Sequence, residues 1–232
     1  MFFISKYCLN DFSRSKFYIL LGGVQNPVPD IYIYLPYFSP DYMLFYSLME
    51  KIPLDTISGL NHAFDLHHST VDEVIGLIQI SHGMAEHKVR YLSLINFLNQ
   101  HGYHVAIYDH RGHGDRIIDN KIGFFDKFAG WELVVMDLIK VHTETSRLFP
   151  KLPKILLGHS MGSWIALSAL QKKTLFNAAL ISGSNYPNMP ETILQKILLK
   201  FEMLRLGREG YSKFLHKVIF GGFNSRFKDA IT

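Results

Sequence analysis

Residues 154–170 read KILLGHSMGSWIALSAL, and this stretch decides the fold. KILL predicts a short buried strand, and WIALSAL, after the pentapeptide GHSMG, predicts a helix. Gly158 and Gly162 leave room for a sharp strand-to-helix turn that would lift Ser160 out of the sheet, with His159 as a structural neighbour. At a helix start, backbone N–H groups and the helix dipole favour negative charge. The pattern predicts a nucleophile at Ser160; the alternative is a chance match in which Ser160 only caps the helix.

On both sides of this stretch, from Lys51 onward, short apolar runs alternate with longer segments of helical period. Strands are predicted at residues 75–81, 103–109, 154–157 and 176–182, and helices at 91–98, 131–148 and 160–172. A further, antiparallel strand is predicted at 58–68, with Gly59 at a turn. This alternation predicts an α/β fold, with a mostly parallel sheet and helices on both of its faces.

A second polar motif, HGMAEH at residues 82–87, follows the strand predicted at 75–81. An acyl-transfer site needs two N–H donors for an oxyanion, one from the residue after the nucleophile and one from the loop after an earlier strand. Met161 and Met84 occupy these two positions. Gly83 would let the backbone approach a substrate closely.

The same motif invites a zinc-site interpretation, with His82, Glu86 and His87 as ligands. The spacing is one residue too long for an inverted zincin motif and turns the two ends off a shared helix face. We therefore expect no metal and no cofactor.

A third motif, DHRGHG at residues 109–114, follows the strand predicted at 103–109. Its histidines and acids could be mistaken for ligands. Because an open α/β sheet gathers polar loops at the carboxyl edge of its strands, we expect Asp109 and Arg111 to hold loops by hydrogen bonds.

The motifs HGMAEH, YDHRGHG and GHSMG, in this order and each after a predicted strand, resemble the α/β-hydrolase superfamily, and more closely its monoacylglycerol lipase and lysophospholipase branch, often labelled serine aminopeptidase-like. The resemblance runs from about Lys51 to the end of the chain. It implies Ser160 as nucleophile, Met84 and Met161 as backbone oxyanion donors, and a lid that begins near Asn185. It also implies hydrolysis, through an acyl-enzyme, of a carboxylic ester of one long acyl chain, such as a monoglyceride or lysophospholipid. Asp115 and Arg116 depart from the small or hydroxylated residue that usually follows GHG.

The fold that this resemblance implies carries a catalytic acid and a histidine base after the serine. Neither is recognised in the 50 residues from 183 to 232, where His216 lies in the helical pattern SKFLHKVIF. We therefore expect a hydrolase chain that ends within its lid and, lacking both groups, is nearly inactive alone. The alternative is a catalytically dead homologue that binds lipid or a partner.

Composition divides the chain into residues 1–48, an aromatic-rich extension, residues 49–184, the hydrolase core, and residues 185–232, a partial lid. The extension holds 13 of the 32 aromatic residues. It is interpreted either as an arm packed on the domain or, preferably, as sequence upstream of a natural start at Met49.

The lid segment predicts an amphipathic helix with a basic fringe. Its apolar face consists of Ile193, Leu194, Ile197, Leu198, Phe201 and Leu204, and its basic residues are Lys196, Lys200 and Arg205. Two interpretations stay open, a lipid-facing lid that contacts a membrane surface transiently and a cap helix that buries its apolar face.

Charge and cysteine usage exclude several other classes of protein. Lys and Arg balance Asp and Glu at 16 each over residues 1–186 and outnumber them 8 to 4 over residues 187–232, so the net charge of +4 belongs to the lid segment. No basic stripe indicates a nucleic-acid partner. The single cysteine, Cys8, excludes an intramolecular disulfide, and no apolar run reaches the roughly 18 residues of a transmembrane helix. We expect a cytoplasmic protein.

Overall fold

The computed structural model of the chain describes residues 17–21, 49–57, 60–172, 175–185, 189–207, 209–210 and 212–220. The chain divides into two compact units. The larger comprises residues 12–184, and the described part of the smaller begins at Asn185.

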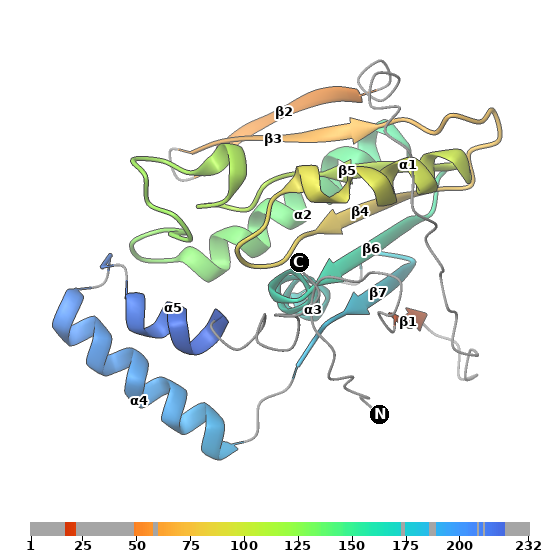
Figure 1. Cartoon of the computed structure of the whole chain (residues 1–232). Coiled ribbons are helices and arrows are strands. Elements are labelled where there is room, and N and C mark those ends of the chain that lie inside the picture. Colours follow the sequence, from red (N-terminus) through yellow and green to blue (C-terminus); the bar gives the residue numbers. More distant parts are fainter. Residues whose placement is uncertain are drawn as a thin grey trace, which may run out of the picture. The chain divides into compact units, whose positions relative to one another are not determined.

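A seven-stranded sheet in the order β1-β7-β6-β4-β5-β3-β2 forms the centre of the larger unit (Figure 1). Its strands are β1 (Phe17–Leu21), β2 (Met49–Ile57), β3 (Leu60–His67), β4 (Gly76–Ser81), β5 (Tyr103–Ile107), β6 (Lys154–His159) and β7 (Ala178–Ser182). Strands β4 to β7 run parallel, whereas β1, β2 and β3 pair antiparallel with their neighbours. The predicted, mostly parallel sheet is confirmed.

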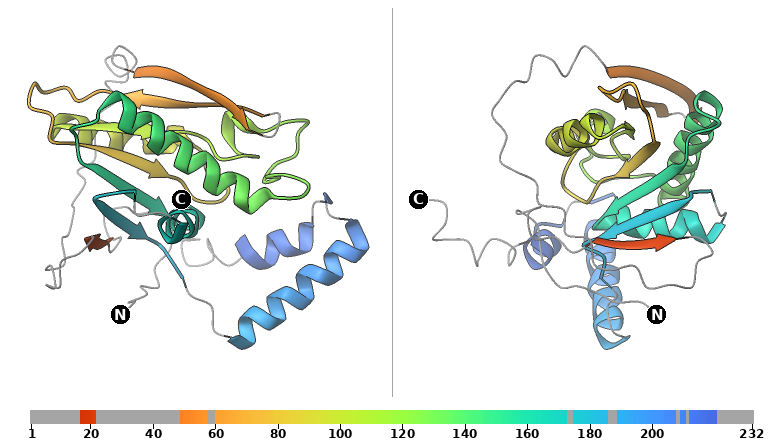
Figure 2. Two further views of the ribbon diagram at one scale, coloured as in Figure 1. Left: turned by 180° about the vertical axis from the view of Figure 1, so that it is seen from behind. Right: turned by 90° about the vertical axis from the view of Figure 1, so that its right-hand side faces the viewer.

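Helices cover both faces of this sheet, as predicted (Figure 2). The helix α1 (Leu92–Gln100), preceded by the 3-10 turn η3 (Lys88–Tyr91), packs on one face. The helices α2 (Gly130–Leu148) and α3 (Met161–Lys172) pack on the other, and a second 3-10 turn, η4 (Gly114–Arg116), lies between β5 and α2.

Successive side chains of β4 point to opposite faces of the sheet, so this short strand contributes to both hydrophobic cores. Ile78 and Ile80 point toward α1, whereas Leu77 joins the core formed with α2 and α3. Gln79 points to the α2 side as well, and its amide donates a 2.9 Å hydrogen bond to the backbone oxygen of Leu138 in α2. Because both faces are covered, the strand is buried throughout, as predicted for residues 75–81.

Strands β2 and β3 form an antiparallel pair in the region where the sequence predicted a single antiparallel strand. β3 matches the antiparallel strand predicted at 58–68, while β2, which pairs with it, was not predicted. Pro53 lies in β2, which is compatible with an edge strand because an edge strand leaves one row of N–H groups unpaired. The predicted turn at Gly59 lies outside the described residues. Within residues 1–48 the structure describes only β1, which pairs with β7.

Strand order places a topological switch at the centre of the sheet. β5 follows β4 in the chain and lies on one side of it, but the next strand, β6, lies on the other side. The loops that leave β4 and β6 therefore diverge above the same edge of the sheet, where open α/β sheets bind their ligands. Two of the three predicted motifs, HGMAEH and GHSMG, lie in these loops.

The described part of the smaller unit contains the helices α4 (Met189–Leu206) and α5 (Lys213–Phe220). Glu202 of α4 forms a 2.7 Å ion pair with Arg205 and accepts a hydrogen bond from Ser212. Ser212 also caps α5, because its hydroxyl accepts the N–H of Leu215 at 3.0 Å. His216 lies in α5, which agrees with the helical interpretation of its segment.

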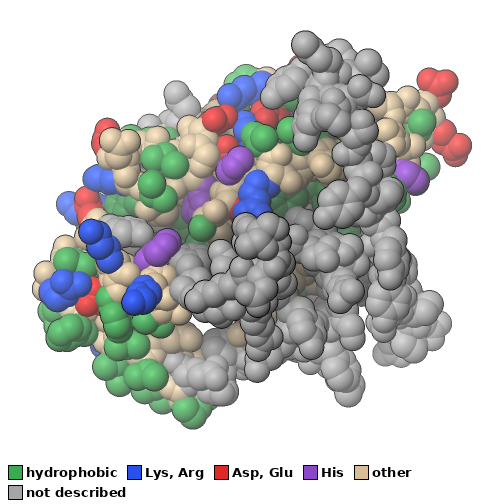
Figure 3. Space-filling view, in the orientation of Figure 1, with side chains coloured by type: hydrophobic (Ala, Val, Ile, Leu, Met, Phe, Trp, Pro, Cys, Tyr) green, Lys and Arg blue, Asp and Glu red, His purple; other side chains and the backbone are tan. Residues whose placement is uncertain are grey.

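The apolar face predicted for the lid is largely exposed on α4, where it lies beside basic side chains (Figure 3). The large apolar side chains exposed among those predicted are Ile193, Leu194, Ile197, Phe201 and Leu204. Arg205 lies in the last turn of α4 and forms an ion pair with Glu202, so Lys196 and Lys200 are the other basic residues predicted for this helix. None of the described helices is both long and apolar enough to cross a membrane.

Candidate active site

Ser160 occupies the sharp turn between β6 and α3. Its φ is +51°, a left-handed conformation that costs a residue with a side chain about 1–2 kcal/mol. The Ser160 N–H donates a 2.9 Å hydrogen bond to the backbone oxygen of Ser182 at the end of β7, which holds the strained turn against the neighbouring strand. The helix therefore begins one residue later than predicted, at Met161.

Glycines on either side of Ser160 make the turn sterically possible. A Cβ at Gly158 would lie 2.8 Å from the backbone oxygen of Gly162 and from the Cα of Ser163. A Cβ at Gly162 would lie 2.0 Å from the backbone oxygen of Ser81. Real Cβ atoms do not approach so closely, so both positions require glycine and the first turn of α3 rests directly on the end of β4.

The loop after β4 lies against Ser160. A Cβ built on Gly83 would lie 3.2 Å from the Cβ of Ser160, so the two motifs, about 77 residues apart in sequence, meet in space as predicted. The loop is held by Glu86, whose buried carboxylate accepts the Gly83 N–H and, at 2.7 Å, the hydroxyl of Tyr91. Burial first, and the charge of Glu86 next, raise the pKa of Tyr91 strongly, so it stays a donor.

Glu86 was considered in the sequence only as a metal ligand, and the structure gives it the role of fixing this loop. The left-handed Ala85, with a φ of +60°, turns the chain back so that Glu86 can reach Gly83. Among the described residues, no group of three or more His, Cys, Asp or Glu side chains could hold a metal ion.

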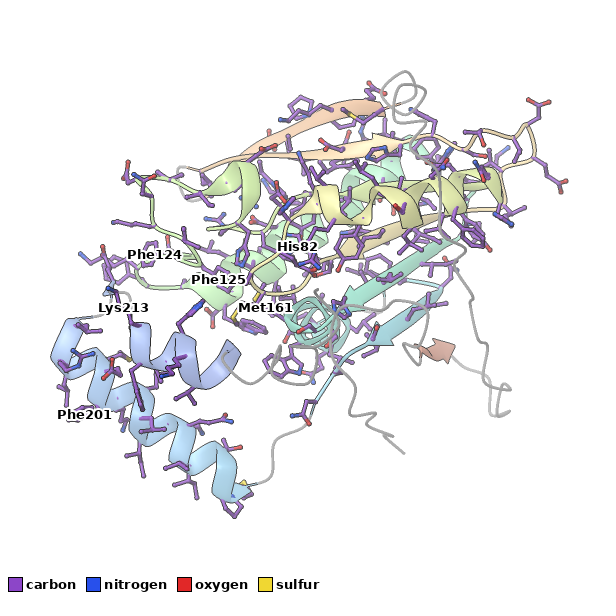
Figure 4. The ribbon with its side chains drawn as sticks, in the orientation of Figure 1. His82, Phe124, Phe125, Met161, Phe201 and Lys213 are labelled. Carbon is purple, nitrogen blue, oxygen red and sulfur yellow. The ribbon has the colours of Figure 1, made fainter. Side chains whose placement is uncertain are left out.

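His82 also holds the loop after β4 through its ring nitrogens. Its Nε2 accepts the backbone N–H of His110 at 2.9 Å, so the proton is on Nδ1, which donates to the backbone oxygen of Gly83 at 2.8 Å. Burial, above all, lowers the pKa of His82 to about 4. A neutral imidazole therefore joins the loop after β4 to the loop after β5 (Figure 4).

The other histidines near the turn are engaged in the same way. Nε2 of His110 lies 3.1 Å from the hydroxyl of Ser81, and Nδ1 of His159 lies 3.3 Å from the hydroxyl of Ser182. Burial lowers the pKa of both imidazoles. Within the part of the chain that the structure describes, no histidine forms a hydrogen bond with the Ser160 hydroxyl.

The two predicted oxyanion donors are backbone groups of Met84 and Met161. Met161 is the first residue of α3, so its N–H belongs to the helix N-terminus, which lacks intrahelical acceptors. Across the described residues neither N–H donates a hydrogen bond. The Met161 side chain is buried in the core, while that of Met84 is exposed. The role of these two N–H groups as oxyanion donors stays a prediction.

The prediction that Asp109 and Arg111 hold loops by hydrogen bonds is confirmed. The Asp109 carboxylate accepts the N–H of Lys88 at 2.8 Å and that of Asp115 at 2.9 Å. Arg111 forms a bidentate pair with Asp137 of α2, at 2.9 and 3.1 Å. Both residues fix the loop after β5 rather than face Ser160.

Comparison with known families agrees with this geometry. Residues 72–208 match the family described as "Serine aminopeptidase, S33". The chain belongs to this family. The match includes all three motifs and therefore confirms the resemblance recognised in the sequence.

Curated relatives of this S33 chain include the monoglyceride lipase of Rattus norvegicus, which is 31% identical over 140 residues, or 57% of this chain and 45% of that protein. The probable lysophospholipase L2 of Haemophilus influenzae is 36% identical over 122 residues, or 50% of this chain and 38% of that protein. The matched part thus spans less than half of the length of either relative.

Solved structures support the α/β-hydrolase fold. A thermostable carboxyl esterase from Bacillus coagulans, in complex with glycerol, superposes with a TM-score of 0.63 at 24% identity, covering 79% of this chain and 59% of that one. A lipase in its open form gives a TM-score of 0.62 at 23% identity, covering 78% and 59%.

Proposed function

We propose that this chain carries the nucleophile and the oxyanion donors of a serine carboxylester hydrolase that acts on single-acyl lipids. The observation that carries the proposal is Ser160 at φ +51°, with the Gly83 loop packed against it. The names of the monoglyceride lipase and lysophospholipase relatives support a monoacylglycerol or a lysophospholipid as substrate.

In the proposed reaction, the Ser160 oxygen attacks the ester carbonyl carbon. The negative charge that develops on the carbonyl oxygen is stabilised by the N–H groups of Met84 and Met161, and loss of one such donor typically costs about 3 kcal/mol of transition-state stabilisation. The alcohol leaves with a proton and the acyl group stays on Ser160. Water then releases the fatty acid.

The activity that we expect of this chain is limited by removal of the proton from the Ser160 hydroxyl. Both ring nitrogens of His82 are already in hydrogen bonds, and no described histidine is bonded to the Ser160 hydroxyl. A serine without a base is a weak nucleophile. We therefore expect slow acylation, and a catalytically dead homologue that binds lipid or a partner is the alternative.

A fluorophosphonate probe separates these two functions. We expect the purified chain to be labelled slowly, the Ser160→Ala variant not at all, and the Ser168→Ala variant, a matched change within α3, like the parent chain. Added imidazole should accelerate labelling in proportion to its concentration, because it supplies the base from solution. Equal labelling of the parent and Ser160→Ala, or no labelling even with imidazole, would favour the non-catalytic alternative.

Transient membrane contact through α4 is the second part of the proposal. Its support is the row of exposed apolar side chains beside Lys196 and Lys200, a pattern of interfacial helices. Flotation with anionic and with neutral vesicles tests it. We expect preference for anionic vesicles and weaker binding of Lys196→Glu. Binding that ignores both changes would favour a cap helix that buries this face.

A further inference from the structure

Two buried arginines of the segment between β5 and α2, Arg111 and Arg116, share the carboxylate of Asp137 in α2. Nε of Arg111 lies 2.9 Å and Nη1 of Arg116 lies 2.8 Å from the same oxygen of Asp137. Arg111 is 1% exposed, Arg116 is 7% exposed and Asp137 is fully buried. Arginine stays charged in proteins, so this trio carries one positive charge in excess, away from bulk water.

Arg116 is the member of the trio with unused hydrogen-bonding capacity. Its Nη1 contacts Asp137 and, at 3.3 Å, the backbone oxygen of Asp109. Its Nε and Nη2 are buried and have no hydrogen-bond partner among the described residues. A charged donor left in this state is costly, which indicates that a partner is to be supplied from outside the trio.

The positive charge of Arg116 is felt by its neighbours. The pKa of His62 is lowered to about 4, by burial first and by the charge of Arg116 next, while the charge and the backbone oxygen of Asp137 oppose this shift. The charge of Arg116 thus reaches a buried neighbour outside the trio.

A cavity of about 190 Å³ adjoins this charge. Its lining includes Arg111, Arg116, Ile118, Asp119, Lys121 and Asp126. Of its two acids, Asp126 already accepts the N–H groups of Phe128 and Ala129 at 2.8 and 3.1 Å, and Asp119 is exposed. Arg111, Arg116 and Lys121 thus line the cavity together with two acids and several apolar side chains, and its volume leaves room for several atoms beyond a single water of about 30 Å³.

We propose that this cavity binds a phosphate group, with Arg116 as the principal donor and Arg111 beside it. A phosphate monoester carries a charge of about −1.5 to −2 near neutral pH and three acceptor oxygens, which suit a guanidinium with two unpartnered donors. The group comes either as free inorganic phosphate or as part of a glycerophosphate head group. All lining residues belong to the larger unit, and the proposal does not depend on ester hydrolysis at Ser160.

Isothermal titration calorimetry with the full chain tests this site, using as probes inorganic phosphate, the monoester glycerol 3-phosphate and glycerophosphocholine, a diester that carries less charge and fewer free oxygens. Ionic strength is kept constant with sodium chloride, so that a general salt effect is not taken for binding. We expect saturable binding of at least one probe. Tighter binding of inorganic phosphate identifies the free anion as the ligand, and tighter binding of either glycerol derivative identifies a head group.

Four variants make the test specific to the cavity. Arg116→Met removes the charge and should weaken binding roughly tenfold or more. Ile118→Asp, at a half-exposed lining position that leaves the trio intact, adds a negative charge and should also weaken binding. Asp119→Asn removes an exposed negative charge at a φ of +51°, which asparagine tolerates, and should tighten binding about twofold. Arg147→Met, at an exposed position paired with Glu144, is the control and should bind like the parent.

Absence of saturable binding for all three probes overturns the proposal and leaves the cavity to water. Binding that is unchanged in both Ile118→Asp and Asp119→Asn places the anion elsewhere and overturns it as well. Because these two variants leave the buried trio untouched, the result stands even where Arg116→Met fails to fold. Fluorophosphonate labelling of Ser160 in the same samples tests the proposed hydrolase function separately.

Discussion

Gly162 in the first turn of α3 touches the backbone of Ser81 at the end of β4, so closely that a Cβ at Gly162 would lie 2.0 Å from the Ser81 oxygen. This contact sets the distance between the helix that follows Ser160 and the strand that leads into the Gly83 loop. The two halves of the candidate active site are therefore positioned by one backbone contact rather than by their side chains.

Gly162→Ala should destabilise the chain by more than about 3 kcal/mol, because the added methyl group meets backbone atoms that cannot move aside. Urea unfolding measures this change. Gly123→Ala is the control, since a Cβ there meets nothing within 4 Å and only the φ of +73° adds a cost, about 1 kcal/mol. Equal losses in the two variants would contradict the proposed contact.

Ser160→Gly should stabilise the chain by about 1 kcal/mol, because glycine adopts a positive φ without the strain that a side chain brings. The matched change Ser168→Gly, inside α3, should destabilise it by a similar amount, because glycine is a poor helix former. Thermal or urea unfolding distinguishes the two. A loss of stability in both variants would show that the turn at Ser160 is not strained.

Acid should destabilise the fold between pH 6.5 and 4. The pKa of His62, His82, His104 and His142 is lowered from 6.5 to about 4, mainly by burial. The unfolded chain therefore binds more protons than the folded chain in this interval, and the stability present above pH 6.5 is lost as the pH falls.

His82→Gln isolates one of these histidines. Urea denaturation at several pH values measures the slope of the unfolding free energy against pH. In this variant the slope should decrease by an amount that corresponds to the uptake of up to one proton on unfolding. Lys140→Gln is the control, because lysine does not titrate in this interval. A slope that is unchanged in His82→Gln would contradict a neutral, buried His82.

Asp137→Asn should destabilise the chain by about 3–5 kcal/mol, because it leaves two buried guanidinium groups without their shared carboxylate. The double variant with Arg116→Met should lose clearly less than the sum of the two single changes, since the charges interact directly. A double-mutant cycle from urea unfolding measures this coupling. Strict additivity would show that Arg116 and Asp137 do not interact.

Glu86→Ala should destabilise the chain by roughly 2–3 kcal/mol and speed hydrogen exchange in the loop of residues 82–86, because two buried donors lose their acceptor. Tyr91→Phe removes only one of the two hydrogen bonds and should cost about 1 kcal/mol. Unchanged exchange in Glu86→Ala would show that Glu86 does not hold this loop.

The central part of the fold could be predicted from the sequence because its strands and helices have distinct periods. The flanks of GHSMG identified β6 and α3, and the position of HGMAEH after an earlier strand indicated that its loop and the GHSMG turn belong to one site. β2 was missed because Lys51, Pro53 and Asp55 occupy its exposed positions and make an edge strand resemble a loop.

The roles of single polar residues could not be predicted in the same way. Arg116 and Asp137 are 21 residues apart, and nothing in either segment indicates that they pair. Glu86 holds its loop only because Ala85 adopts a left-handed conformation, which alanine seldom signals in a sequence. Such roles depend on tertiary distances, whereas periodicity reports only local structure.

The strand order also has a consequence for synthesis on the ribosome. β4 has β6 as one of its two neighbours, and the 72 residues numbered 82–153 lie between them in the chain. At a translation rate of about 5–20 residues per second, β4 waits roughly 4 to 14 seconds for that neighbour. During this interval the β4 edge that will pair with β6 has no strand beside it, so the most buried strand of the finished sheet is the segment most exposed to aggregation while the chain is being made.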